Sequence, residues 1–223
     1  MKPLSKLQLN SINKERSDRL AVLKLPNDEI NDELFSQVSM LKSVDRAQVL
    51  GAWDYAKSLD YHHEGQSKQV YLAHPVRVAM LFNILVTPPY VVGIKTSLLH
   101  NVLEVGDISY GKLVHDVGGE VAKAIKILTV DRAVQWDWQY KDKYYDEISN
   151  GKKFIKQVKI IDKLDNLFLL CLNSNDEIRE KYLYEIERWI LPLTENVFPD
   201  IVSYVEELIE DNRRVGYVSL DSF

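Results

Sequence analysis

The amino-acid sequence predicts an all-α fold, a bundle of roughly eight or nine helices. Apolar residues recur three and four positions apart along most of the chain, which is the spacing of one face of an α-helix. Proline and glycine pairs such as Pro88-Pro89 and Gly118-Gly119 separate these segments. The sequence shows no strand-helix alternation, no glycine-rich phosphate loop and no repeat of about 20 to 50 residues. Together these observations favour helices over a mixed α/β fold.

Length and composition indicate one globular domain with short extensions. The chain has 223 residues, of which 46% are hydrophobic and 27% are charged, as is usual for a folded domain. We expect an N-terminal arm with a short helix over residues 1–45, the main domain over 46–212 and a tail over 213–223. The single cysteine, Cys171, cannot form an internal disulfide, which agrees with a reducing compartment.

Charge and hydropathy argue against two classes of partner. With 28 Lys and Arg against 33 Asp and Glu the net charge is −5, so a broad surface for nucleic-acid backbones is not expected. An acidic protein that binds a phosphate ester needs a metal ion or local basic residues to offset the repulsion. No apolar run reaches the roughly 18 residues of a membrane span, and the first residues lack the apolar core of a signal peptide. We therefore expect a cytoplasmic protein with neither nucleic acid nor membrane as its partner.

In the first half of the chain, helical spacing is found over residues 30–41 and again over 49–60. The next helix is expected to begin at His74-Pro75, because proline suits the first position of a helix. Another follows Pro88-Pro89 and is expected to continue through Glu104. This last helix carries several polar residues near its C-terminal end.

In the second half, helices are expected over residues 108–117, 120–128, 154–172 and, as two helices, 176–212. A turn at Asn150-Gly151 precedes the third of these, and the final pair is expected to break near Pro192 or Pro199. The stretch 136–145 is polar and crowded with tryptophan and tyrosine, and no helix is assigned to it.

Six polar residues on three of the expected helices could meet at one point. They are His74, His100, Asn101, Glu104, Asp162 and Asn166. Glu104 follows His100 by four residues, as Asn166 follows Asp162, so each pair would share one helix face. Imidazoles and carboxylates from several helices are a ligand set for Mn, Fe or Zn, and such an ion makes bound water nucleophilic. Each of these residues alone is more often an ordinary polar side chain, so spacing leaves the metal site open.

Four segments of the sequence carry a resemblance to a known family. They are YAKSLDYHHEGQSKQVYLAHPVRVAML, SLLHNVLEVGDIS, GGEVAKAIKILT and VKIIDKLDNLFLL. In this order they resemble the hydrolase domain of the Rel/SpoT alarmone proteins and their small stand-alone relatives, members of the HD superfamily. The resemblance covers about residues 46 to 205. It implies an HD-domain helical bundle, manganese as cofactor, and removal of pyrophosphate from the 3′ position of guanosine polyphosphates.

The resemblance also implies roles for individual residues. His74, His100 and Asp162 match three of the family's metal ligands. Glu104 matches a glutamate that works on the attacking water, and Asn166 matches an asparagine that contacts the nucleotide. These matches define a metal centre with three of four ligands in place.

Three departures from the family pattern concern the reaction directly. Asn101 occupies the position of the fourth metal ligand, an aspartate, and Val105 replaces the aspartate that follows the catalytic glutamate. Asp165 replaces a common histidine. An amide offers only a neutral oxygen to the ion, and even changes around the ligands cost about 10 to 100-fold in affinity or activity. Valine at position 105 cannot accept a proton, whereas a positioned proton acceptor typically contributes about 10² to 10⁴-fold to the reaction rate. The changes at Asn101 and Val105 both predict weak or absent hydrolysis. Glu104 and Asn101 are the residues expected at the catalytic positions.

Substrate contacts are expected from Lys68 and Arg77, near basic positions that the resemblance places facing the substrate. The loop over residues 66–71 that leads to them is shorter than is usual in the family. The aromatic stretch 136–145 could stack a purine, with Lys141 or Lys143 near its phosphates, or its rings could pack the flank of the bundle or a homodimer contact. His115-Asp116 is the literal His-Asp dipeptide of the sequence, and we expect a surface pair there because no glutamate follows it.

Two functions remain open from the sequence. One is a manganese-dependent nucleotide pyrophosphohydrolase with weakened or altered activity, acting on a guanosine polyphosphate or related nucleotide. The other is a catalytically inactive HD-domain protein that binds a nucleotide or a protein partner. Metal binding together with pyrophosphate release would separate the first from the second, and from a purely structural role.

Overall fold

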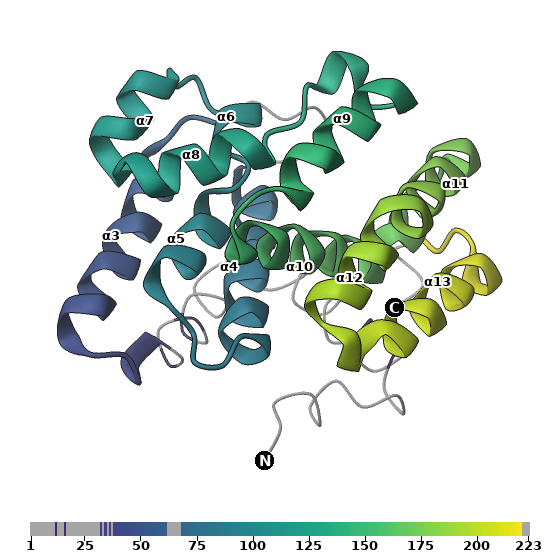
Figure 1. Cartoon of the computed structure of the whole chain (residues 1–223), viewed down its shortest axis with the longest axis horizontal. Coiled ribbons are helices and arrows are strands. Elements are labelled where there is room, and N and C mark those ends of the chain that lie inside the picture. Colours follow the sequence, from purple (N-terminus) through teal and green to yellow (C-terminus); the bar gives the residue numbers. More distant parts are fainter. Residues whose placement is uncertain are drawn as a thin grey trace. The chain divides into compact units, whose positions relative to one another are not determined.

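The computed structural model describes residues 38–61 and 68–219, together with Ile12, Arg16, Asp32, Leu34 and Ser36. Within these residues every regular element is a helix (Figure 1), and the one bridge of β type joins Tyr61 to Gly106. The predicted all-α fold is therefore confirmed. No helix in this part of the chain combines the length and apolar character needed to cross a membrane.

Backbone contacts divide the chain into two compact units, one of Pro26–Lys159 and one of Met1–Leu25 together with Ile160–Phe223. The expected domain limits, 1–45, 46–212 and 213–223, differ from this division and stay a prediction. Most of the expected arm, the shortened loop up to residue 67 and the last residues of the tail lie outside the described residues.

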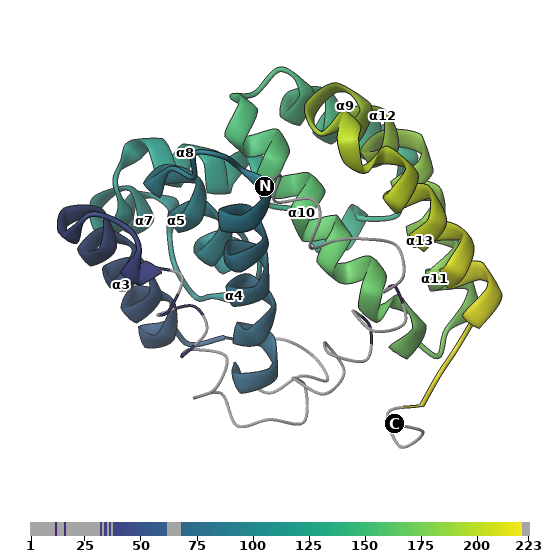
Figure 2. The same cartoon turned by 90° about the horizontal axis from the view of Figure 1, so that it is seen from below.

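The core of the unit Pro26–Lys159 is built on α3 (Ser43–Ser58), α4 (Lys68–Leu85) and α5 (Val91–Leu99). Helix α5 packs against both of the others and lies between them in Figure 1 and Figure 2. The approach of α5 to α4 is close because Gly93 faces Phe82, where a Cβ would lie 2.1 Å from the ring Cζ. A larger residue at Gly93 would therefore separate the two helices.

The same unit continues through a short α6 (Val102–Val105), then α7 (Tyr110–Val117), α8 (Gly119–Leu128) and α9 (Trp138–Ser149). Gly118 links α7 to α8 with a φ of 90°, a conformation that glycine adopts without strain. Helix α8 packs against α5 and α6, and so anchors the chain that follows α5. Helix α10 (Lys153–Leu169) begins in this unit and continues without a break into the other.

The second unit contains the rest of α10 and a helical C-terminal half. Its further elements are η3 (Leu170–Leu172), α11 (Asp176–Glu185), the π-helix η4 (Ile186–Ile190), α12 (Leu191–Val197), η5 (Pro199–Ile201) and α13 (Val202–Val215). Helix α12 packs on α13. Arg16, far away in sequence, is buried here, with its Nη1 2.5 Å from Asp211 of α13 and its Nε donating to the carbonyl of Phe168 at 3.2 Å.

The expected start of a helix at His74-Pro75 is wrong, because α4 already begins at Lys68 and Pro75 lies inside it. Proline in a helix interior removes one backbone hydrogen bond and costs about 3 kcal/mol or more. Residues 71–79, apart from His74, are buried, and their packing offsets that cost. The tertiary environment thus outweighs the local preference of proline.

The continuous helix expected to carry His100, Asn101 and Glu104 is interrupted. Helix α5 ends at Leu99, Asn101 has φ −102° and ψ 0°, and a single turn, α6, starts at Val102. These dihedral angles lie in the sparsely populated bridge region, which does not propagate an α-helix. His100 and Glu104 therefore do not lie on one continuous helix, and the expectation that they share a helix face is wrong.

One further difference, and the outcome of one open alternative, concern the second half of the chain. The aromatic stretch to which no helix was assigned forms η2 (Arg132–Val134) and α9. Of the two expected places for a break, the break falls at Pro199; Pro192 lies in a helical run that passes without interruption from the π-helix η4 into α12.

Candidate metal centre

Two histidines from neighbouring helices face one another in the unit Pro26–Lys159. His74 lies in the middle of α4, and His100 directly follows α5. Their ring centroids are 5.2 Å apart with the planes at 71°, an edge-on arrangement. Because α4 and α5 pack against each other, the fold itself brings the two imidazoles together.

The tautomer of His100 follows from its hydrogen bond. Its Nδ1 lies 2.7 Å from the carbonyl oxygen of Ser97, and a carbonyl can only accept, so Nδ1 carries the proton. In the neutral ring the lone pair then resides on Nε2. A backbone carbonyl that holds one ring nitrogen while the other binds a metal is the usual arrangement for a histidine ligand. The His100 side chain is buried, which fixes the direction in which Nε2 points.

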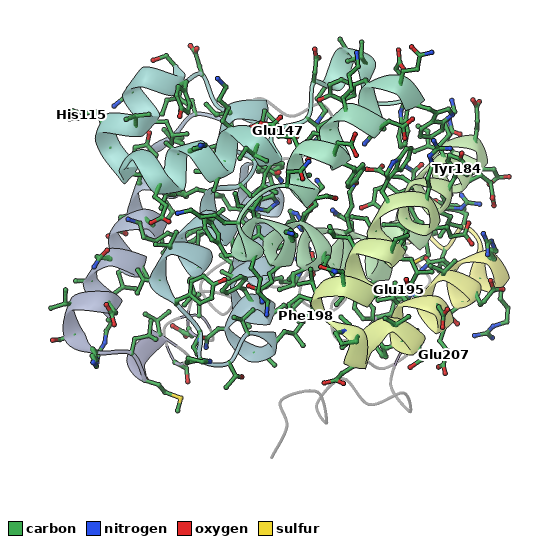
Figure 3. The ribbon with its side chains drawn as sticks, in the orientation of Figure 1. His115, Glu147, Tyr184, Glu195, Phe198 and Glu207 are labelled. Carbon is green, nitrogen blue, oxygen red and sulfur yellow. The ribbon has the colours of Figure 1, made fainter. Side chains whose placement is uncertain are left out.

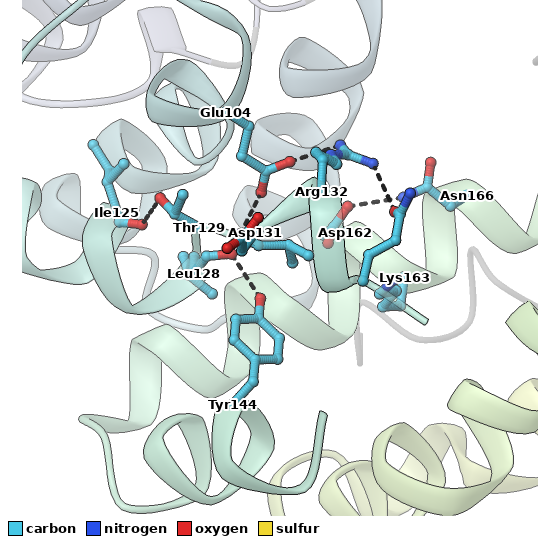
Figure 4. A network of polar contacts seen from close by, with 12 residues as sticks. Glu104, Ile125, Leu128, Thr129, Asp131, Arg132, Tyr144, Asp162, Lys163 and Asn166 are labelled. Carbon is cyan, nitrogen blue, oxygen red and sulfur yellow. Dashed lines mark hydrogen bonds and ion pairs between the residues drawn. The ribbon is translucent and has the colours of Figure 1, made fainter. Parts of the chain in front are cut away.

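Asp162 is oriented by its own helix. Its Oδ1 accepts a hydrogen bond from Nδ2 of Asn166 at 2.9 Å, one turn later on α10 (Figure 4). The expected pairing of these two residues on one helix face is therefore confirmed. Burial, followed by the charges of Asp162 and Glu185, raises the pKa of the Tyr182 phenol well above its ordinary value, so Tyr182 stays protonated beside this carboxylate.

His74, His100 and Asp162 each offer one ligand atom, and these atoms all lie within 4.8 Å of one another. Ligand atoms that share one ion at about 2.1 Å are roughly 3 to 4 Å apart, so small side-chain adjustments suffice. Two imidazole nitrogens and one carboxylate oxygen fit a divalent transition metal such as Mn, Fe or Zn. The donor set and the His100 tautomer both fit an ion at this position.

Asn101, at the position where the family pattern has a fourth ligand, lies near Tyr71 and Glu104. Burial first, and then the charge of Glu104, raise the pKa of the Tyr71 phenol, while Arg132 and the Asn101 side chain act in the lowering direction. The amide of Asn101 therefore belongs to a polar cluster with Tyr71 and Glu104.

Both carboxylate oxygens of Glu104 are occupied (Figure 4). Oε1 accepts a hydrogen bond from the backbone N–H of Val130 at 2.9 Å, and Oε2 lies 2.6 Å from Nη2 of Arg132. The Glu104 side chain is 2% exposed, whereas that of Arg132 is 51% exposed. Sequence reasoning missed Arg132, because a contact between α6 and a short 3₁₀ turn leaves no periodic signal.

Helix α9 holds the segment that carries Arg132. The hydroxyl of Tyr144 donates to the carbonyl of Leu128 at 2.6 Å, and the N–H of Asp131 donates to the hydroxyl of Tyr140 at 2.8 Å. The backbone on the N-terminal side of Arg132 is thus tied to α9 and, through Val130, to Glu104.

The aromatic stretch surrounds a buried lysine. Nζ of Lys141, whose side chain is on the inner face of α9, lies 5.9 Å from the Trp136 ring centroid and 5.8 Å from those of Tyr144 and Tyr145. Tyr144 and Tyr145 are buried, as in the packing alternative. Lys143, expected near substrate phosphates, is exposed on the same helix.

The remaining expected positions lie as follows. Arg77 is buried in α4, and Val105 is buried at the end of α6. Lys68 begins α4, and its side chain lies outside the described residues. His115 points outward from α7 (Figure 3) and pairs with Asp116 at 2.8 Å, as expected of a surface pair.

Comparison with known proteins supports the fold. No protein-family model matches the sequence, and no curated protein sequence matches it. The structure is similar to a solved structure of a metazoan ortholog of SpoT, a protein that hydrolyzes ppGpp and plays a role in starvation responses. The similarity has a TM-score of 0.60 at 19% sequence identity and covers 77% of this chain and 97% of that one. The chain therefore has the helical HD-domain fold of that hydrolase.

Proposed function

We propose that this protein is a metal-dependent phosphohydrolase that acts on a guanosine polyphosphate or related nucleotide, with weakened activity. The observation that carries the proposal is the convergence of His74, His100 and Asp162 within 4.8 Å. The fold shared with a ppGpp hydrolase supports the same class of substrate. Manganese is the ion we expect, and His74, His100 and Asp162 would hold it.

A divalent ion bound there would supply a water nucleophile at neutral pH and positive charge to offset the phosphate. The residues of this chain prepare that chemistry. The Ser97 carbonyl holds His100 with its Nδ1 protonated, and Asn166 holds the Asp162 carboxylate. A fixed tautomer and a fixed carboxylate lower the reorganisation that metal binding would otherwise require.

Two observations explain why the activity should be weak. The Glu104 carboxylate, expected to work on the attacking water, is engaged by Val130 and Arg132. Asn101 supplies a neutral amide in place of a charged ligand. A second function, binding of a nucleotide without turnover, is favoured by the same two residues.

Metal binding tests the first step. We expect manganese, titrated by calorimetry into chelator-treated full-length protein, to bind the wild type and to bind His100→Ala and Asp162→Ala at least about 10 to 100-fold more weakly. His115→Ala is the matched control, because this histidine is exposed on α7 and should leave the affinity unchanged. Equal manganese affinity in all four proteins would reject the metal centre.

Turnover tests the second step. Release of pyrophosphate from a guanosine nucleotide with a 3′-diphosphate should be slow, manganese-dependent and abolished in His100→Ala. We expect Asn101→Asp to raise both manganese affinity and turnover, because it restores a charged oxygen beside His100. A manganese-binding protein without turnover in either form would support the binding function instead.

A further inference from the structure

We propose that Arg132 is the residue through which this site receives an anionic phosphate group, and that Glu104 holds Arg132 until the anion arrives. The exchange would release the Glu104 carboxylate at the moment the substrate binds. The second half of this inference rests on the proposed hydrolase function, whereas anion binding by Arg132 does not.

The first support is the asymmetry of the ion pair. The Glu104 carboxylate is almost completely inside the protein at 2% exposure, while the Arg132 side chain that covers it is 51% exposed. A solute can therefore reach the guanidinium without displacing any helix. An arginine presents several N–H donors in a planar fork that matches two phosphate oxygens at once, which a single carboxylate oxygen cannot use fully.

The second support is that the exchange is local. Leu128, Val130 and Asp131 are each fixed by a hydrogen bond, so the backbone leading to Arg132 stays in place while its side chain turns. Nη1 of Arg132 has a long contact of 3.4 Å to Gln135 Oε1, which is easily given up.

The third support is that the Glu104 carboxylate keeps a hydrogen bond after Arg132 has moved away. Its Oε1 keeps the 2.9 Å hydrogen bond from Val130, while Oε2 becomes available to accept a proton or a water hydrogen. Without the exchange, Oε2 stays paired with Arg132 at 2.6 Å and is not available to a water molecule. The protein also carries a net charge of −5, so a phosphate ester needs a local cation such as this one.

A purely structural ion pair makes a different prediction. If Arg132 only neutralised Glu104, removing the carboxylate would not improve anion binding. If Glu104 competes with the anion for Arg132, Glu104→Gln should strengthen anion binding, because the amide has no charge to hold the guanidinium but still accepts from Val130. Under the proposal, and only then, removing the Arg132 side chain weakens anion binding while Glu104→Gln strengthens it.

Calorimetric titration with inorganic pyrophosphate tests this in full-length protein with a chelator present. We expect Arg132→Gln to weaken pyrophosphate binding about ten- to hundredfold, the value of one charge-assisted interaction, and Glu104→Gln to strengthen it several-fold. Arg213 and Glu187 form the matched control, an exposed pair at 2.7 Å elsewhere on the surface, and Arg213→Gln and Glu187→Gln should change nothing.

Wild-type affinity in Arg132→Gln, or no gain in Glu104→Gln, would overturn the proposal, as would an equal gain in Glu187→Gln. If Arg132→Gln does not fold by circular dichroism, Arg132→Lys keeps the charge without the fork and should still bind pyrophosphate several-fold more weakly than wild type. Because no metal is present, failure of the metal centre leaves these outcomes unchanged. The two proposals can thus fail separately.

Discussion

Two buried carboxylates in this protein, Asp211 and Glu104, each face an arginine, and the arginines differ. Asp211 pairs with Arg16, and the two side chains are 6% and 4% exposed. Glu104 pairs with Arg132, and there the carboxylate is 2% exposed but the arginine 51%. Both carboxylates are almost inaccessible to water, so the two pairs differ in how far the arginine is exposed.

This contrast separates a stabilising pair from an exchangeable one. Arg16 also donates to the carbonyl of Phe168, so its departure would leave a buried carboxylate and a buried carbonyl without this partner. Half of the Arg132 side chain is already exposed to solvent, so the exchange proposed for it would carry a small desolvation cost. The same pair of functional groups is thus fully buried in one unit, whereas in the other its arginine is half exposed.

The largest effect is expected from breaking the fully buried pair. Arg16→Ala should lower the free energy of unfolding by about 3 kcal/mol, the lower end of the range of about 3 to 5 for removing one partner of a buried pair. The lower end applies because Arg214, largely exposed, also contacts Asp211. Urea denaturation followed by circular dichroism measures it.

The control for Arg16→Ala is Arg213→Ala on α13, whose ion pairs with Glu187 and Glu210 lie on the surface. It should change stability by no more than about 0.5 kcal/mol. Similar losses in the two variants would mean that burial of the pair does not determine its contribution.

A smaller effect is expected from the exchangeable pair. Arg132→Ala should lower the free energy of unfolding by about 1 to 2 kcal/mol, because water can enter where the guanidinium lay and the hydrogen bond from Val130 to Glu104 remains. The same denaturation series measures it. A loss as large as that of Arg16→Ala would show that Arg132 is a fixed part of the core, and the exchange proposed for it would become untenable.

The fold was predictable wherever the buried face of a helix is apolar. Helix α3 lies within a few residues of its predicted position, because Val49, Ala52, Trp53 and Ala56 repeat with helical spacing and are all buried. Helix α9 was missed because its buried face includes Lys141, whose charge hides the repeat. A lysine enclosed by aromatic rings can occupy a core position, which a simple polar or apolar assignment does not anticipate.

The candidate site divides in the same way. His74, His100 and Asp162 were predicted from motifs that are local in sequence, and the structure brings their ligand atoms together. Arg132 was not predicted, because its partner Glu104 is distant in sequence and the pairing depends on how the segment after α8 folds back. Tertiary contacts of loops are the part of a site that sequence patterns describe least well.

The smallest effect is expected at a third carboxylate, Asp116, whose basic partners are exposed. Asp116 accepts from His115 and is paired with Lys112 at 2.6 Å, and both partners are largely exposed. The hydrogen bonds from His115 and then Lys112 lower the pKa of Asp116 from 3.8 to about 2. Because the folded-state pKa is the lower one, this contribution to stability is present above about pH 4 and is lost as the pH falls toward about 2.

Asp116→Asn removes that contribution, so the variant should be slightly less stable than the wild type at pH 6. The two proteins should become equally stable near pH 2. Thermal unfolding at intervals between these pH values, in low salt, measures the difference. Raising the salt concentration should abolish it, since solvent and ions screen exposed charges. The stability losses caused by Arg16→Ala and Arg132→Ala should persist at high salt, because their carboxylate partners are shielded from solvent. The effects of the three ion pairs on stability would then follow their burial and not their interatomic distances.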